Sequence, residues 1–252
     1  MRKLLSALIA ATAMTITVGY GLAAERSVSV VLVHGAFVDG SGWQQVYSRL
    51  KKGGYEVIVV QNSTATLDGD VATTDQAIGR AKYPVVLVGH SYGGMVITEA
   101  GVNPKVRSLA YIAAFVPDEN ESVSSLISKP VPGAAEVPIL PPQDGFLTLD
   151  VAKFPASFAA DVDLERTTFM ASSQVPWGVA AVDAKITKAA WKSKPTFFLI
   201  TTNDHMIPTP SQREMATRAR ASMIEVSSSH AVMLSHPDKV ASFIERVADS
   251  TK

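Results

Sequence analysis

The stretch Val85–Gly94 reads Val-Val-Leu-Val-Gly-His-Ser-Tyr-Gly-Gly, and the interpretation of the whole chain starts from it. Four apolar residues run directly into a Gly-x-Ser-x-Gly sequence centred on Ser91. This pattern predicts a buried strand that turns sharply into a helix, with the serine in a strained backbone conformation at the turn. Glycines two residues before and after the serine let strand and helix approach closely. The Ser91 hydroxyl is therefore expected above the edge of a sheet, as a candidate nucleophile.

The composition indicates one globular domain and excludes several kinds of chemistry. The chain has 252 residues, 47% of them apolar, which is enough for one sizeable core. Its formal net charge is zero and it lacks a long basic run, so neither a nucleic acid nor an anionic membrane surface is expected as a partner. The absence of cysteine excludes a thiol nucleophile, a disulfide framework and thiolate metal sites.

The N-terminus has the pattern of a secretory signal peptide. Met1-Arg-Lys precedes an alanine-rich apolar run over residues 4–18. The run is short for a membrane span and is interrupted by threonines, which favours cleavage over anchoring. Cleavage is expected after Ala23 or Ala24, so residues 1–24 are excluded from the fold and no stable membrane span should remain. The mature protein is accordingly expected in the periplasm or outside the cell.

The rest of the chain, residues 25–252, alternates between strand and helix patterns and is expected to form one domain. Besides the run before Ser91, apolar and β-branched segments predict strands at 28–33, 55–60, 106–113, 196–201 and 223–226. Helices are expected at about 43–50, 70–82, 163–172, 211–220 and 237–247. The alternation predicts a parallel sheet of six strands with right-handed crossovers.

The segment from about residue 116 to 191 departs from this alternation. Frequent prolines interrupt short helical pieces there. The segment is too long for a simple connection and too apolar for a disordered linker. It is interpreted as a lid over the top of the sheet. Phe37, Phe115 and Trp177 are candidates for the wall of an apolar pocket beneath the lid, although ordinary core packing is the simpler interpretation.

A glycine-containing loop, His34-Gly-Ala-Phe37, follows the first expected strand. Backbone N–H groups in such a loop have no strand partner and can face the nucleophile, which is how an oxyanion hole forms without charged side chains. The N–H group of Tyr92 is a second candidate donor, because it lies where the helix after Ser91 begins.

Two other strand ends carry the residues that a serine nucleophile needs. Thr201-Thr-Asn-Asp-His205 follows the fifth strand, and Ser227-Ser-Ser-His-Ala231 follows the sixth. Because the carboxyl ends of parallel strands share one edge of the sheet, both segments should lie on the same edge as Ser91. A neutral imidazole can take the serine proton, and a buried carboxylate can orient that imidazole. His230 and Asp204 suit these two roles.

Asp118, just after the fourth strand, is an alternative acid on the same edge. Asp204 is preferred because its turn directly follows the fifth strand. Asp118 could instead be the N-cap of a helix over residues 119–127.

The other histidines are assigned structural or surface positions. His34 and His90 lie in the two loops and are expected to make structural hydrogen bonds, whereas His205 and His236 are expected at the surface or at helix ends. The histidines lack metal-ligand spacing with a carboxylate beside them, so no metal site and no cofactor are expected.

Four segments together resemble the α/β-hydrolase superfamily. They are Val-Leu-Val-His-Gly-Ala-Phe (31–37), Gly-His-Ser-Tyr-Gly-Gly (89–94), Tyr-Ile-Ala-Ala-Phe-Val-Pro-Asp-Glu (111–119) and Ser-His-Ala-Val-Met-Leu-Ser (229–235). The resemblance covers residues 28–248 and is closest to the small-lid branch, which holds plant methylesterases, hydroxynitrile lyases and bacterial esterase-like proteins. It implies an α/β-hydrolase fold, with about six parallel strands flanked by helices and a helical lid insertion.

The resemblance also implies site residues. Ser91, Asp204 and His230 match the nucleophile, acid and base of the family, and the backbone N–H groups of Ala36 and Tyr92 match its oxyanion donors.

The lyases of this branch have a threonine and a lysine where this chain has Gly35 and Ala231. The resemblance therefore implies a serine hydrolase acting on small carboxylic esters. Lactone or amide hydrolysis, cofactor-free oxygenase or lyase chemistry, and a non-catalytic small-molecule binding protein are the alternatives on the same fold.

Overall fold

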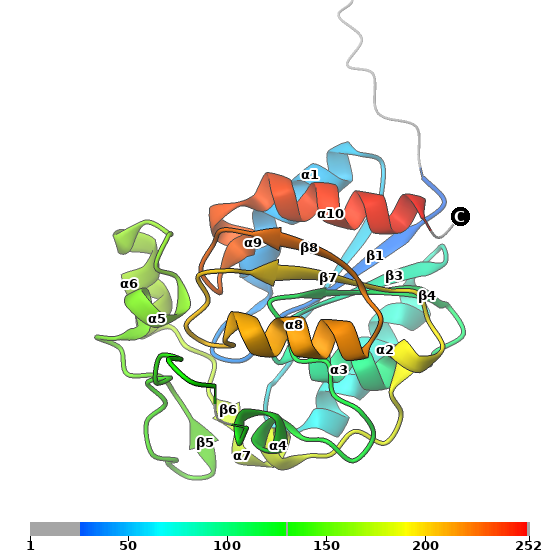
Figure 1. The fold of residues 1–252 in the computed structure, drawn as a ribbon. Coiled ribbons are helices and arrows are strands. Elements are labelled where there is room, and N and C mark those ends of the chain that lie inside the picture. Colours follow the sequence, from blue (N-terminus) through cyan, green and yellow to red (C-terminus); the bar gives the residue numbers. More distant parts are fainter. Residues whose placement is uncertain (1–25, 130, 251–252) are drawn as a thin grey trace, which may run out of the picture.

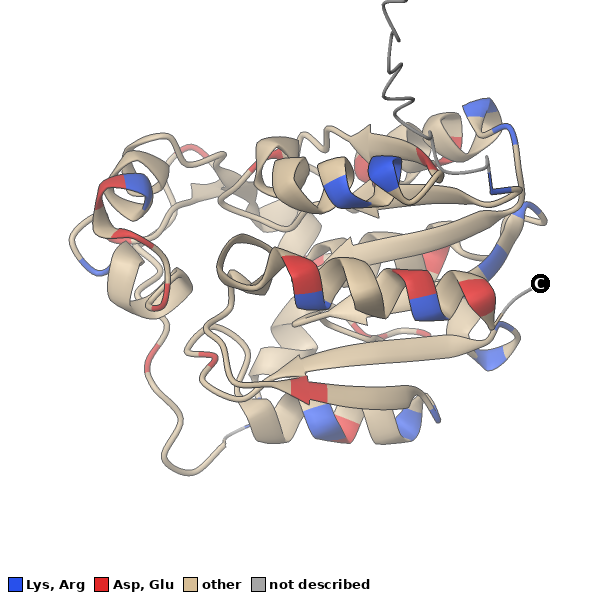
Figure 2. Ribbon diagram, turned by 90° about the horizontal axis from the view of Figure 1, so that it is seen from above, with Lys and Arg blue, Asp and Glu red and all other residues tan. Residues whose placement is uncertain are grey.

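The computed structural model describes residues 26–129 and 131–250 (Figure 1). The expected signal peptide, residues 1–24, lies outside the described residues and stays a prediction. Within the part that is described, no helix is both long enough and apolar enough to cross a membrane. Lys, Arg, Asp and Glu residues are interspersed on the helices and loops around the sheet (Figure 2).

A sheet of six parallel strands forms the centre of the fold, as the sequence predicts. In chain order the strands are β1 (Ser29–Val33), β2 (Glu56–Val60), β3 (Val85–His90), β4 (Val106–Ile112), β7 (Thr196–Thr201) and β8 (Ser222–Val226). β1 and β3 are buried along their whole length. Both faces of these strands are covered, which explains why their apolar runs show no alternation.

The strand order β2-β1-β3-β4-β7-β8 creates a switch point between β1 and β3. The chain passes from β1 outward to β2, and then returns to add β3, β4, β7 and β8 on the other side of β1. Open α/β sheets bind ligands in the crevice at the carboxyl ends of the strands where the order reverses. The loops after β1 and β3, which contain Ala36 and Ser91, therefore meet at this crevice.

Helices cover both faces of the sheet (Figure 1). α1 (Gln44–Lys52), which follows the 3-10 turn η1 (Gly40–Trp43), packs with α10 (Pro237–Asp249) on one face. α2 (Leu67–Arg80) packs with α3 (Gly93–Ala100) on the other face, and α8 (Thr209–Arg218) lies against β7. α10 buries Val240, Phe243, Ile244 and Val247. This spacing places its apolar side chains on one stripe that faces the core.

The segment between β4 and β7, which was expected to be a lid, consists of short elements. They are α4 (Val123–Ile127), β5 (Phe146–Leu147), α5 (Phe154–Phe158), α6 (Leu164–Ser172), β6 (Trp177–Gly178), α7 (Val179–Asp183) and η2 (Ala190–Lys192). α5 and α6 lie beyond the carboxyl ends of the strands (Figure 1). The sequence does not predict the antiparallel pair β5–β6, because strands of two residues are too short to show a periodic pattern.

The helix expected over residues 119–127 was placed too early. It begins at Val123, and its N-cap is Ser122 rather than Asp118. The Ser122 side chain accepts a hydrogen bond from the Ser125 N–H, and the Ser125 hydroxyl lies 2.9 Å from the Ser122 N–H. This reciprocal capping box satisfies two backbone donors at once, which a single aspartate at 118 would not do.

We expect Gly94→Ala to destabilise the fold, because a Cβ at this position would lie 2.0 Å from the backbone oxygen of Phe115. Overpacking against backbone costs about 1–3 kcal/mol or more. Gly79→Ala is the matched control, since a Cβ in this helical position meets nothing within 4 Å. It should stabilise α2 by about 0.5–1 kcal/mol. Chemical denaturation of both variants measures the difference, and equal effects would contradict the expectation.

Candidate active site

Ser91 occupies a strained turn between β3 and α3. Its φ of 55° lies in the left-handed region, which non-glycine residues rarely adopt. The turn is held by backbone hydrogen bonds: the Ser91 N–H donates to Ile112 O, and the Ser91 carbonyl accepts from Gly94 N and Phe115 N. These bonds anchor the turn to the end of β4, so the surrounding structure maintains the strain.

The two glycines of the motif are required by close backbone approaches, as the sequence predicts. A Cβ on Gly89 would lie 2.6 Å from the Gly93 carbonyl oxygen. A Cβ on Gly93 would lie 2.8 Å from the carbonyl oxygens of both Val33 and His34. A side chain at Gly89 would push α3 away from β3, and one at Gly93 would push α3 away from the end of β1.

The loop after β1 lies directly against Ser91. A Cβ on Gly35 would lie 2.6 Å from Ser91 Cβ and 3.2 Å from its hydroxyl oxygen. Within residues 26–129 and 131–250, the backbone N–H groups of Ala36 and Tyr92 donate to no other group. Both residues are nearly fully buried. Two unpaired backbone donors thus flank the serine on the β1 and β3 loops.

His34 holds the loop after β1 in place. Its Nδ1 lies 2.8 Å from Gly35 O, and its Nε2 lies 2.9 Å from the backbone N–H of Asn62. The carbonyl can only accept and the N–H can only donate, so Nδ1 carries the proton and Nε2 accepts. Burial lowers the pKa of His34 and keeps this neutral tautomer. The expected structural role of His34 is therefore confirmed.

His230 and Asp204 form a fully buried pair. His230 Nδ1 lies 2.8 Å from Asp204 Oδ2, and both side chains are completely buried. Because a carboxylate only accepts, Nδ1 carries the proton and the lone pair of the neutral imidazole is on Nε2. This is the tautomer that a general base for a serine requires.

Five donors surround the Asp204 carboxylate. Oδ2 accepts from Thr201, Gln212 and His230, and Oδ1 accepts from the backbone N–H groups of Met206 and Ile207. Burial alone would raise the pKa of Asp204, but the electrostatic attraction of the His230 N–H and these hydrogen bonds outweigh the effect of burial and lower the pKa. The acid therefore stays ionised in a buried position.

Gln212, which the sequence analysis did not single out, organises this acid from α8. The side chain is fully buried, and its Nε2 donates to Asp204 Oδ2 at 2.9 Å and to Ile207 O at 2.8 Å. Its Oε1 accepts from the Thr201 N–H. A glutamine on a mostly polar helix gives no sequence signal for such a role, because its burial depends on how α8 packs against β7.

His90, the residue before the serine, contacts the other side of the His230 loop. Its Nε2 lies 2.9 Å from the His230 carbonyl, and the two ring centroids are 4.6 Å apart. Complete burial lowers the pKa of His90 well below its ordinary value, and the electrostatic effect of the neighbouring His230 acts in the same direction. His90 is therefore a neutral hydrogen-bond donor, as the sequence predicts.

Ser91 and His230 make no hydrogen bond to each other in this structure. His230 Nε2 is buried and, among the described residues, has no hydrogen-bond partner. Catalytic hydrogen bonds are often long or misaligned without substrate and tighten in the complex. The structure thus joins the acid to the histidine and leaves the second imidazole nitrogen free to act as a base.

Asp118 is engaged elsewhere. Its Oδ1 accepts from the Glu119 N–H and forms an ion pair with Lys192 Nζ. The carboxylate that His230 Nδ1 contacts is that of Asp204. The other two histidines lie elsewhere: His205 bonds Ala156 O, and His236 bonds Ser227 O and lies 4.0 Å from Asp161 Oδ2.

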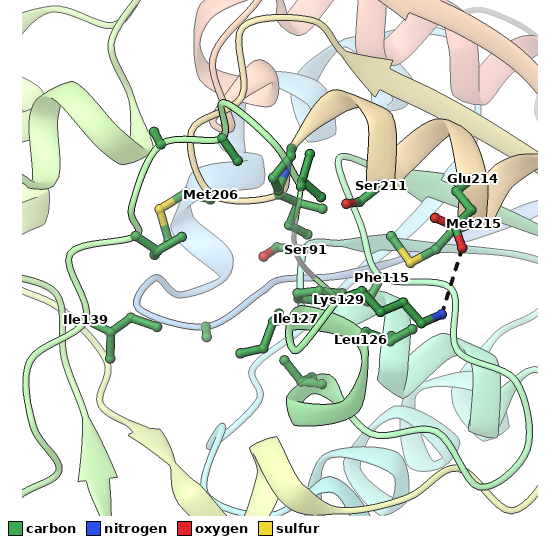
Figure 3. A pocket seen from close by; sticks show the side chains of 18 of the residues that line it. Ser91, Phe115, Leu126, Ile127, Lys129, Ile139, Met206, Ser211, Glu214 and Met215 are labelled. Atoms are coloured by element: carbon green, nitrogen blue, oxygen red, sulfur yellow. Dashed lines mark ion pairs between the residues drawn. The ribbon is translucent and has the colours of Figure 1, made fainter.

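A cavity of about 290 Å³ opens at Ser91 (Figure 3). Phe37, Phe115 and Trp177 all contribute to its wall, together with residues of the lid and of α8. Figure 3 shows Ser91 among Met206, Phe115 and Ile127, with Lys129 and Glu214 joined by an ion pair farther along the wall. In the part of the chain that the structure describes, no three carboxylate or histidine side chains are grouped as metal ligands would be.

The comparisons with known proteins agree with this architecture. A model of the alpha/beta hydrolase family matches residues 30–243, so the chain belongs to this family and the expected fold and family are confirmed. A carbendazim hydrolyzing esterase from Nocardioides sp. is 37% identical over 116 residues. The match covers 40% of this chain and about half (48%) of that esterase.

Two solved structures show the same fold. A pyrethroid hydrolase from Sphingobium faniae JZ-2 superposes with a TM-score of 0.75 at 21% identity, covering 89% of this chain and 98% of the other. The methylesterase MES16 from Arabidopsis has a TM-score of 0.73 at 19% identity, covering 88% of this chain and 99% of the other. Plant methylesterases are thus among the structural neighbours, as the resemblance implies.

We expect Asp204→Asn to destabilise the protein at neutral pH and progressively less in acid. A carboxyl whose folded-state pKa is depressed adds stability above its unfolded pKa of about 3.9, and this stability is lost as the pH falls through the folded value. The difference in thermal midpoint between wild type and Asp204→Asn should therefore shrink below about pH 4. Asp118→Asn is the control, because its half-exposed ion pair should contribute little at any pH. A difference independent of pH would contradict the expectation.

Proposed function

We propose that the protein is a serine esterase that cleaves small carboxylic esters through an acyl-enzyme on Ser91. The observation that carries the proposal is the buried Asp204–His230 pair at 2.8 Å, which fixes a neutral imidazole on the same sheet edge as the strained serine. The family match, and the esterase among the sequence relatives, support the same class of reaction.

The residues have defined roles in this reaction. His230 Nε2 takes the Ser91 proton as the serine oxygen attacks the ester carbonyl. The unpaired N–H groups of Ala36 and Tyr92 stabilise the oxyanion of the tetrahedral intermediate. His230 then returns the proton to the leaving alcohol, and Asp204 stabilises the transient imidazolium. Water then gives a proton to His230 as its oxygen attacks the acyl-enzyme carbonyl. His230 returns this proton to the Ser91 oxygen as the bond to the acyl group breaks, which releases the carboxylic acid product and restores the Ser91 hydroxyl.

The lack of room for a side chain at position 35 favours ester hydrolysis over cyanohydrin cleavage. The lyases that this chain resembles have a threonine at this position. A side chain here would begin 2.6 Å from Ser91 Cβ, so this backbone does not accommodate one without movement of the loop.

We expect Ser91→Ala to abolish both turnover of a chromogenic short-chain ester and labelling by a fluorophosphonate. Loss of the nucleophile should lower kcat by about 10⁴- to 10⁶-fold. Retained labelling in this variant would overturn the assignment of Ser91.

A matched pair of variants separates the two candidate acids. Asp204→Asn should lower kcat by about 10⁴-fold, because the amide favours the wrong imidazole tautomer. Asp118→Asn, whose carboxylate pairs with Lys192 instead, should leave kcat nearly unchanged. The reverse pattern would make Asp118 the acid.

The size and the lining of the cavity support a preference for esters in which the acyl or the alcohol group is bulky and uncharged. Its volume of about 290 Å³ equals roughly ten water molecules at liquid density, which suits a ring-bearing group. Both cations of its wall already face carboxylates: Lys129 lies 3.8 Å from Glu214, and Arg218 forms a two-pronged pair with Glu121. A substrate anion would lose its hydration without gaining a free positive charge.

We expect 4-nitrophenyl 3-phenylpropanoate to be a better substrate than its analogue with a carboxylate on the ring. The kcat/KM values should differ by about 100-fold or more, because an unpaired charge is costly to desolvate. Glu214→Gln should reduce the difference in kcat/KM between the two esters, because Lys129 then loses one of its carboxylate partners and can attract the anionic substrate. Preference of the wild type for the anionic ester would contradict this substrate class.

A further inference from the structure

The turn between α5 and α6 of the lid contacts the loop that carries His230. Phe158, the last residue of α5, accepts a hydrogen bond through its carbonyl from the Ala231 N–H at 3.1 Å. Its ring lies edge-on to the His230 ring, with centroids 4.9 Å apart. The residue after His230 and the imidazole itself are therefore both in contact with the lid.

Asp161, three residues farther along the lid, holds the other side of the same loop. Its Oδ2 accepts from the Ser228 hydroxyl at 2.8 Å and from the Ser229 N–H at 3.1 Å, and its Oδ1 accepts from the Ser229 hydroxyl. Partial burial alone would raise the pKa of Asp161, but these hydrogen bonds lower it, so the carboxylate stays ionised. Ser228 and Ser229 are almost fully buried.

Lid residues thus bind the His230 loop both before and after the histidine. The body of the fold contributes further contacts: Asp204 bonds the imidazole, His90 bonds the His230 carbonyl, and the Asn203 N–H donates to the Ser228 carbonyl at 3.1 Å. Ser228 and Ser229 have no direct contact with the proposed reaction. Their hydrogen bonds to Asp161 are charge-assisted, and such bonds are roughly twice as strong as neutral ones.

We infer that the lid positions the catalytic base, with Asp161 holding residues 228–229 so that His230 Nε2 is presented to Ser91. This inference rests on the proposed esterase function. Catalytic groups must be held within about 0.5 Å of their productive geometry. A lid that has moved away would therefore leave the acid and the histidine paired but the base misplaced. Asp161 is a positioning residue, because it acts through the loop and touches no reacting atom.

The test compares Asp161→Ala with Asp163→Ala, using 4-nitrophenyl acetate, a substrate too small to depend on the lid as a pocket wall. The Asp163 side chain caps α6 by accepting from the N–H groups of Glu165 and Arg166. Its loss should weaken the start of the lid helix without affecting kcat. Asp161→Ala should lower kcat by about 10- to 100-fold with little change in KM, because the base is displaced while the pocket is kept.

Two further variants show whether the effect passes through the loop. Asp161→Asn keeps an oxygen acceptor for the Ser229 N–H and should restore most of kcat. Ser229→Ala should lower kcat in the wild type but add little in the Asp161→Ala background, because both changes remove the same contact.

Equal kcat losses in Asp161→Ala and Asp163→Ala, a change confined to KM, or additive effects of Asp161→Ala and Ser229→Ala would overturn the inference. Failure of the wild type to react with a fluorophosphonate would instead overturn the esterase function on which the inference rests.

Discussion

The close contact between the turn at Ser91 and the end of β1 is the constraint on which the rest of the site depends. The turn combines a left-handed serine with glycines that allow α3 to approach the Val33 and His34 carbonyls. Such backbone strain costs about 1–3 kcal/mol and persists only where the surroundings maintain it. Here both backbone groups of Ser91 are hydrogen-bonded, and the helix start is wedged against the neighbouring strand. The serine and the two unpaired N–H groups are therefore held in one place by packing rather than by charge.

The proposed acid and base, Asp204 and His230, are held by hydrogen bonds and burial instead. Asp204 is buried, which opposes its ionisation, yet five donors, His230 among them, keep it charged. Movement of this carboxylate would break several hydrogen bonds, so its position is fixed. It therefore also fixes the tautomer of His230 and the orientation of its ring. Asp118 has comparable sequence context but lies half-exposed beside Lys192. Burial and hydrogen bonding, rather than position after a strand, distinguish the two carboxylates.

The lid joins these two parts of the site. Its α4 region supplies apolar wall to the cavity at Ser91, while the turn after α5 binds the loop around His230. The ion pairs of Arg218 with Glu121 and of Lys129 with Glu214 tie the lid to α8. The same helix carries Gln212, which binds Asp204. Pocket wall, base and acid are thus connected through α8 and the lid.

The sequence by itself determined the parallel sheet and the positions of Ser91, Asp204 and His230 at its carboxyl edge. Strand runs such as Val30–Val33 are apolar because the sheet is covered on both faces. Gly89 and Gly93, at the turn that contains Ser91, leave no room for a side chain. Both features can be recognised in a short stretch of sequence. Only the tertiary structure showed which carboxylate contacts His230, that Gln212 supports it, and that Asp161 reaches across to Ser228 and Ser229. Asp161 and Ser229 are 68 positions apart in the chain, and a polar residue carries no sequence signal of its distant partner. The start of α4 at Val123 likewise depended on the reciprocal bonds of Ser122 and Ser125, which only the folded backbone reveals.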